Sequence, residues 1–223
     1  MAAEVSIPVG KDVCVQGELS VPGGASGVVL FAHGSGSSRF SPRNRYVARR
    51  LEGALLATLL VDLLTPEEEE AERWTRHLRL DIELLAQRLG EVTRWLAEDA
   101  RTSGLTVGYF GASTGAGAAL VAAAREPDRV AAVVSRGGRP DLAGAQLMNV
   151  HAPVLLIVGG NDTPVIEMNR RALHMLHVER QLVIVPGAGH LFEEPGALER
   201  VAELATVWFM QKLGAYADFP APR

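Results

Sequence analysis

The sequence predicts an α/β fold with a mainly parallel sheet and helices on both faces. Short apolar runs such as Val28–Ala32 and Val154–Val158 alternate along the chain with segments of helical period such as Leu80–Leu96. Strands that alternate with helices are joined by crossovers, and crossovers produce a parallel sheet. The chain of 223 residues shows no break in composition, so we expect one domain over residues 1–223, with 217–223 as a loose tail.

The first part of the chain predicts an edge hairpin and then two buried strands. Between Val5 and Val21, apolar residues alternate with mostly polar ones, which is typical of one or two strands with one face in water. The runs Val28–Ala32 and Ala57–Val61 are almost wholly apolar, as expected of strands covered on both faces. Between them a helix is expected to start at Ser41-Pro42, because serine is a common N-cap and proline suits the first helical position.

The rest of the chain predicts strands and helices in alternation. The acidic stretch Thr65–Arg76 is interpreted as a long polar connection whose charges face solvent. The connection Ser135–Ala152 has room for a short helix at most, which leaves no space for a large cap domain. Further strands are expected at Thr106–Phe110, Val130–Val134, Val154–Val158 and Leu182–Val185, and further helices at Leu80–Leu96, from Thr114 onward, at Val165–Leu176 and from Ala197 to about Leu213.

Composition and charge narrow the class of protein. Hydrophobic residues make up 48% and charged residues 22% of the chain, as in ordinary globular proteins. A net charge of −4 offers no support for binding nucleic acid or an anionic membrane. Cys14 is the only cysteine, which excludes an internal disulfide. Since the first residues lack the pattern of a signal peptide and no apolar run reaches membrane-spanning length, we expect a cytoplasmic protein.

The functional prediction depends on the motif Gly111-Ala-Ser-Thr-Gly115. A strand is expected before it and an alanine-rich helix after it, so Ser113 stands at a sharp strand-to-helix turn. Such a turn strains the backbone of the serine and projects its hydroxyl outward, while the two glycines prevent collisions where the chain folds back. The alternative is an ordinary glycine-rich turn in which Ser113 only caps the helix.

Two further residues follow strands whose carboxyl ends should meet at the same edge of the sheet. Asp162 comes after the strand Val154–Val158, and His190 comes after the last strand. A serine is a poor nucleophile at its normal pKa and needs a base, usually a histidine that a carboxylate orients. Ser113, Asp162 and His190 occur in the chain order nucleophile, acid, histidine that accompanies such an elbow. The sequence therefore predicts acyl transfer with these three catalytic residues.

Two of the polar residues have structural alternatives. Asp162 stands where a helix cap is expected, but Pro164 suits the first helical position, which makes Thr163 the natural N-cap and leaves Asp162 free. His33, in the loop after an earlier strand, is expected to brace that loop by hydrogen bonding rather than to act as a base.

The chain resembles the α/β-hydrolases over nearly its whole length, and more narrowly their compact dienelactone-hydrolase-type branch. The resemblance is carried by His33–Ser37, Gly111–Gly115, Gly160–Asp162 and Gly187–His190. It implies a hydrolase that uses no metal, nucleotide or organic cofactor. The lactone-cleaving namesakes carry cysteine at the elbow where this chain has Ser113, so a serine carboxylesterase is the better implication.

An oxyanion hole requires backbone N–H groups aimed at the developing negative charge. The N–H of Thr114 is one expected donor, because it directly follows the nucleophile and lies at a helix N-terminus. The resemblance places the second donor at Ser35.

Several residues that follow strand ends are candidates for contact with a substrate. Phe40, Trp74, Leu191 and Phe192 are candidate walls of a substrate pocket, and the alternative is that they are core or surface residues. Arg136 either binds a substrate carboxylate or braces its loop through an ion pair, the second being the more common role.

Together these features predict an enzyme that hydrolyses small or short-chain carboxylic esters through an acyl-enzyme on Ser113. Hydrolysis of a dienelactone, another lactone or a thioester is an alternative, as is a non-catalytic ligand-binding protein on the same fold. The expected partner is a small-molecule ester, and the oligomeric state is left open.

Overall fold

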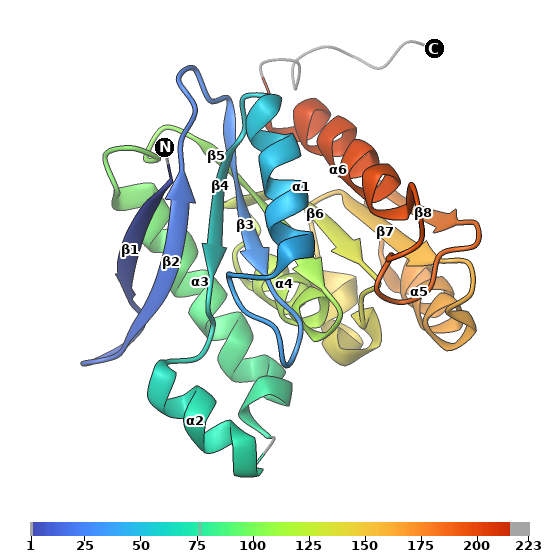
Figure 1. Ribbon diagram of the computed structural model, residues 1–223, viewed down its shortest axis with the longest axis horizontal. Coiled ribbons are helices and arrows are strands. Elements are labelled where there is room, and N and C mark those ends of the chain that lie inside the picture. The colour runs from blue at the N-terminus through green and yellow to red at the C-terminus, as the bar shows by residue number, and fades with distance from the viewer. Residues whose placement is uncertain (1, 76, 215–223) are drawn as a thin grey trace.

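The computed structural model describes residues 2–75 and 77–214, and its centre is an eight-stranded sheet in the order β1-β2-β4-β3-β5-β6-β7-β8 (Figure 1). β1 pairs with β2 and β2 with β4 in antiparallel fashion, and every other pairing in this sheet is parallel. The predicted edge hairpin and mainly parallel sheet are confirmed. The tail expected at 217–223 lies outside the described residues. The strands are β1 Ala3–Pro8, β2 Cys14–Ser20, β3 Gly27–Ala32, β4 Ala57–Val61, β5 Thr106–Ala112, β6 Val130–Arg136, β7 Val154–Gly159 and β8 Arg180–Val185.

Helices cover both faces of the sheet. Apolar residues of α1 and α6 pack with one face, and residues of α3 and α4 pack with the other. In Figure 1, α1 and α6 lie on the near side of the sheet. The helices are α1 Pro42–Gly53, α2 Pro66–Thr75, α3 Ile82–Glu98, α4 Thr114–Arg125, α5 Thr163–Met175 and α6 Ala197–Leu213, with two 3₁₀ segments, η1 Leu78–Leu80 and η2 Pro140–Asn149.

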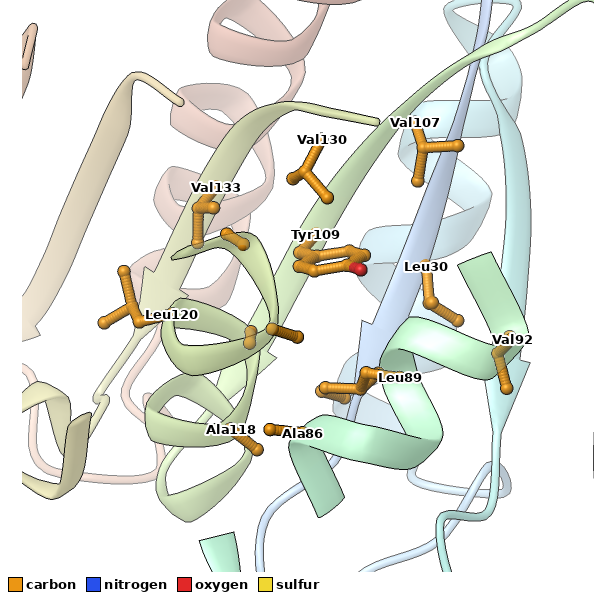
Figure 2. Packing of buried hydrophobic residues seen from close by; sticks show 14 of the residues in the cluster. Leu30, Ala86, Leu89, Val92, Val107, Tyr109, Ala118, Leu120, Val130 and Val133 are labelled. Carbon is orange, nitrogen blue, oxygen red and sulfur yellow. The ribbon is translucent and has the colours of Figure 1, made fainter. Parts of the chain in front are cut away.

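The core between β5 and α3 fixes the strand that leads to the elbow (Figure 2). Tyr109 is fully buried among the apolar side chains of this cluster, and burial raises the pKa of its phenol far above the ordinary value. Its hydroxyl lies 2.6 Å from Thr93 Oγ1, and Thr93 Oγ1 donates in turn to the backbone carbonyl of Leu89 at 2.8 Å. A buried hydroxyl of this kind needs a partner, so the pair sets the position of α3 against β5.

The acidic stretch after β4 differs from the prediction, because it forms the helix α2 instead of an irregular connection. Thr65 and Glu68 make a reciprocal cap at its start: Thr65 N–H donates to Glu68 Oε2 at 2.8 Å, and Glu68 N–H donates to Thr65 Oγ1 at 3.3 Å. Two of the acidic side chains are not solvated as expected. Glu68 pairs with Arg88 of α3, and Glu72 is fully buried. The signal for the helix was the Thr-Pro-Glu-Glu start, which is typical of a capped N-terminus.

The connection after β6 contains the 3₁₀ segment η2, which is kinked at Gly144 where φ is 52°. It is short, as predicted, and it packs against α4 and α5. No large insertion therefore stands over this end of the sheet in the described residues. Among the helices of residues 2–75 and 77–214, none is long and apolar enough to cross a membrane.

Candidate functional site

The turn between β5 and α4 has the geometry of a nucleophile elbow. Ser113 adopts φ 50° and ψ −122°, a strained conformation for a residue with a side chain. A Cβ atom at Gly111 would lie 2.4 Å from Ala116 Cα, and one at Gly115 would lie 2.3 Å from the carbonyl oxygen of Ala32. Only glycine fits at either position, and this close packing forces the serine to the apex of the turn.

The backbone of Ser113 is tied to the end of the neighbouring strand β6. Its N–H donates to the carbonyl of Arg136 at 3.3 Å, and its own carbonyl accepts from the N–H of Arg139 at 3.0 Å. Ser113 is half-buried, so its side chain remains accessible at the carboxyl edge of the sheet.

Asp162 and His190 meet across the loops that follow β7 and β8. His190 Nδ1 lies 2.6 Å from Asp162 Oδ2, and the carboxylate is 13% exposed while the imidazole is 42% exposed. Because a carboxylate can only accept, Nδ1 carries the proton and Nε2 is left with a lone pair. This is the tautomer that a general base requires.

Asp162 differs in one respect from the prediction. It occupies the N-cap position of α5, which begins at Thr163, so Thr163 is not the cap. The Asp162 side chain makes no capping hydrogen bond and turns toward His190 instead. The helix start positions the backbone of the aspartate, and its carboxylate orients the histidine.

The imidazole of His190 lies over Gly137, the residue directly after β6. A Cβ atom at Gly137 would be 3.6 Å from His190 Cε1 and 3.1 Å from the carbonyl oxygen of His190. Since Arg136 accepts a hydrogen bond from Ser113, the histidine and the serine flank the same two residues. No direct hydrogen bond joins Ser113 and His190 within the described chain, and such bonds are often long before substrate binds.

Ser35 and Thr114, the two expected oxyanion donors, lie next to each other. The N–H of Ser35 donates to Thr114 Oγ1 at 2.8 Å. The N–H of Thr114 stands at the first position of α4, where no intrahelical acceptor exists. The sequence predicted the two backbone donors, but it gave no indication that the Thr114 hydroxyl engages one of them.

His33 braces the loop after β3, as the sequence predicts. Its Nδ1 donates to the carbonyl of Gly34 at 2.9 Å, and its Nε2 accepts from the N–H of Leu63 at 3.4 Å. Both ring nitrogens are therefore used in holding the loop that carries Ser35.

The four candidate pocket walls have different environments. Phe40 is 49% exposed and lines a cleft of about 740 Å³ beside the loop after β3, but neither Ser113 nor His190 lines that cleft. Trp74 is 85% exposed, Leu191 is 43% exposed, and neither lines it.

Phe192 corrects the prediction, because it is 1% exposed and belongs to the apolar cluster under α6. Its φ of 56° turns the loop after His190 so that the ring points into the core. Its ring anchors the loop that carries His190 to the core and does not form a pocket wall.

Arg136 has neither the ion pair that the sequence favoured nor any hydrogen bond from its side chain to the residues described. It is 8% exposed. Burial, and secondarily repulsion by Arg43, lowers its pKa to about 10. Arg43, on the first turn of α1, was not singled out in the sequence, where its only signal was its position just after the predicted helix start.

Known proteins resemble this chain over most of its length. Residues 42–212 match the model of the family described as the dienelactone hydrolase family. The crystal structure of a dienelactone hydrolase from Anabaena variabilis is 63% identical, with a TM-score of 0.94, over 96% of this chain and 98% of that one. Est1E from Butyrivibrio proteoclasticus is 16% identical with a TM-score of 0.78, over 94% of this chain and 98% of that one, a likeness of fold alone.

A curated relative adds information about length. A Mycobacterium tuberculosis protein described as a putative phosphoribosyl transferase is 61% identical over 94% of this chain but only 46% of its own length. The chain thus spans about half the length of these curated relatives. The architecture is the α/β-hydrolase fold.

Proposed function

Because the chain belongs to the dienelactone hydrolase family, we propose that it hydrolyses small or short-chain carboxylic esters through an acyl-enzyme on Ser113. The observation that carries the proposal is the 2.6 Å contact between His190 Nδ1 and Asp162 Oδ2 at the same sheet edge as a strained serine. A strained serine by itself could be only part of a tight turn, and a histidine paired with an aspartate could be only a structural ion pair. Their combination is what acyl transfer needs.

The proposed reaction begins with proton transfer from Ser113 Oγ to His190 Nε2. The serine oxygen attacks the ester carbonyl, the alcohol leaves with the proton from His190, and water releases the acid by the same steps. Asp162 stabilises the imidazolium that forms twice in this cycle. The N–H groups of Thr114 and Ser35 receive the oxyanion, and the Ser35 N–H is shared between the substrate oxygen and Thr114 Oγ1, which holds it in place.

The preference for small substrates rests on the short connection after β6. Residues Pro140–Asn149 pack against α4 and α5 and do not cover Ser113 with a cap domain. A long acyl chain would therefore have little apolar surface to bury, and burial of each methylene contributes about 0.8 kcal/mol. The rate constant kcat/KM should be highest for acetyl to butyryl esters and should not rise for longer chains.

A fluorophosphonate probe tests the nucleophile. We expect the wild-type protein to be labelled stoichiometrically and the Ser113→Ala variant not to be labelled. On 4-nitrophenyl butyrate, kcat of the variant should fall by about 10⁶-fold or below detection, because removal of a catalytic serine has that effect in comparable enzymes.

Ser135→Ala is the matched control. Ser135 lies on the adjacent strand β6 and is fully buried, so its loss should leave labelling and kcat almost unchanged. Labelling that persists in Ser113→Ala, or chromogenic esters that are hydrolysed equally well by that variant, would disprove the proposal.

A further inference from the structure

Asn169 is a fully buried polar side chain that joins the helix α5 to the loop after β6. Its Nδ2 donates to the carbonyl of Gly138 at 3.0 Å and to the carbonyl of Val165, one turn earlier on α5, at 2.8 Å. The amide can face two carbonyls only through its nitrogen, because carbonyl oxygens accept and do not donate. In the part of the chain that the structure describes, no other hydrogen bond runs from α5 to residues 136–139.

Packing alone does not account for an amide at this position. The Oδ1 atom of Asn169 is buried and has no hydrogen-bond donor. The bond to Val165 adds little, because a helix carbonyl already accepts from the backbone four residues later. A leucine of similar volume would fill the same space without leaving a buried oxygen unpaired. What the amide provides, and leucine does not, is the link to Gly138.

The backbone around Gly138 holds the proposed nucleophile and base. The residue after it, Arg139, donates its N–H to the carbonyl of Ser113 at 3.0 Å. The residue before it, Gly137, lies against the imidazole of His190, where a Cβ atom would be 3.6 Å from His190 Cε1. A movement of Gly138 therefore shifts the supports of the serine and of the histidine together.

The other end of the link is the helix that carries the proposed acid. Asp162 occupies the N-cap position of α5, and its carboxylate lies 2.6 Å from His190 Nδ1. Val165, the second acceptor of the Asn169 amide, belongs to the first turn of the same helix. Asn169 thus joins the start of α5 to the loop that supports the nucleophile.

We propose that Asn169 is a positioning residue for acyl transfer, which sets the separation between the Asp162–His190 pair and Ser113. This inference rests on the function proposed above and adds a residue to its machinery. The two oxyanion donors are held by a separate hydrogen bond, between Ser35 and Thr114. Loss of the Asn169 amide should therefore slow proton transfer and leave substrate binding nearly intact.

The test replaces Asn169 by leucine, which removes the donor and keeps the volume. In Asn169→Leu, kcat on 4-nitrophenyl butyrate should fall about tenfold to a hundredfold, since a misplacement of about 1 Å has an effect of that size. KM should change less than twofold, because acylation and deacylation use the same three residues and slow together. The rate of labelling by a fluorophosphonate should fall with kcat.

A second variant separates the two hydrogen bonds of the amide. Threonine at this position can still donate to the carbonyl of Val165, but its side chain is one bond shorter and does not reach Gly138. Asn169→Thr should therefore lose as much kcat as Asn169→Leu. It also carries the test if Asn169→Leu does not fold.

Ala172→Gly is the control for a general loss of helix stability. Ala172 is buried in the same helix, and glycine there weakens the helix without removing a hydrogen bond to the loop after β6. The variant should melt at a lower temperature than the wild type and keep kcat within twofold, measured well below the melting temperature.

Three results would overturn the inference. They are an unchanged kcat in Asn169→Leu, a kcat of Asn169→Thr equal to that of the wild type, and a fall in kcat of Ala172→Gly as large as that of Asn169→Leu. Each would leave the proposed function intact as long as Ser113→Ala abolishes labelling. If the wild-type protein is neither labelled nor active on esters, the proposed function fails, and this inference fails with it.

Discussion

The carboxyl edge of the sheet has two sides that are held in different ways. The elbow side consists of β5, α4 and the loops after β6, β7 and β8, and there backbone packs directly on backbone. Positions Gly111, Gly115 and Gly159 would each bring a Cβ atom within 2.3 to 2.4 Å of a neighbouring main-chain atom. Two side chains on this side are thereby left free of structural hydrogen bonds to the helices they precede: Ser113 and Asp162 each occupy an N-cap position, and neither side chain makes a capping hydrogen bond.

The ion-paired side consists of the loop after β3 and the helix α2, and there side chains hold the chain. Arg39 pairs with Asp62, and Arg88 makes a two-pronged contact with Glu68 at 2.6 Å. Buried Glu72 accepts from three backbone N–H groups, among them that of Leu78 at 2.8 Å, and also from Arg79 Nε at 2.9 Å. The charged residues on this side are occupied in structure.

The difference explains which residues are available for chemistry. Main-chain packing by glycine fixes an element without using any functional group, so the polar side chains nearby can act on a substrate. Ion pairing fixes an element by using those groups. Arg136 stands on the elbow side and is unpaired, whereas Arg39, Arg79 and Arg88 stand on the ion-paired side and each has a carboxylate partner.

The largest effect should come from adding one methyl group to the elbow side. In Gly115→Ala, the new Cβ would lie 2.3 Å from the carbonyl oxygen of Ala32, so β3 and α4 must separate. We expect a loss of about 3 kcal/mol in unfolding free energy, and a fall in melting temperature of roughly 6–12 °C, measured by calorimetry.

Gly53→Ala is the matched control for that change. Gly53 ends α1, and a Cβ atom there meets nothing within 4 Å. Alanine at such a site should stabilise by about 0.4–1 kcal/mol through the unfolded state. Equal melting temperatures for the two variants would show that the elbow is not held by close packing.

A smaller effect is expected at the bond that joins the two sides. Thr114→Val removes the Oγ1 acceptor of the Ser35 N–H and with it the link between the loop after β3 and the elbow. A hydrogen bond of this kind contributes about 1 kcal/mol, so kcat/KM on a butyryl ester should fall about fivefold. Steady-state kinetics of Thr114→Ser, which keeps the hydroxyl, should return to the wild-type value. Faster turnover by Thr114→Val would mean instead that the bond blocks the oxyanion donor.

The elbow side could be predicted from the sequence because its signals are local. Gly111 and Gly115 stand in one short motif, and Asp162 and His190 stand directly after apolar runs that end at a common edge. The ion-paired side could not, since its partners are distant in the chain. Glu68 and Arg88, for example, lie 20 residues apart on different helices.

Other outcomes depend on what surrounds a residue in space. The burial of Phe192 follows from one turn with φ 56°, which the sequence does not encode in a visible motif. That Arg136 lacks an acidic partner is a property of the neighbours that α1 and the last loop bring to it. Sequence patterns locate such residues at the edge of the sheet, but only packing decides whether they are paired.

The smallest effect is expected at Glu68, where replacing the carboxyl group should change the unfolding free energy in a way that depends on pH. The hydrogen bonds from Arg88 hold the pKa of Glu68 below its ordinary value of 4.5. A carboxyl group whose pKa is depressed by folding stabilises the protein above its unfolded pKa, and that stabilisation is lost as pH falls through the folded pKa. Glu68→Gln should therefore cost roughly 0.5–1 kcal/mol at pH 7, and the difference from the wild type should shrink below about pH 4. Urea titrations at a series of pH values measure it.

Glu167→Gln provides the comparison for Glu68→Gln. Glu167 also pairs with an arginine, Arg170, at 2.6 Å, but both side chains are more than half exposed and lie on the same helix. Water screens such a pair, so its loss should change the unfolding free energy by only a few tenths of a kcal/mol at pH 7. Arg88, by contrast, is 5% exposed on its side chain, and it should keep its hydrogen bond to the carbonyl of Leu63 when Glu68 is replaced. If Glu68→Gln and Glu167→Gln were equally mild and equally insensitive to pH, the ion pairs near α2 would contribute no more than a solvent-screened surface pair, and ion pairing would not be what holds that side of the edge.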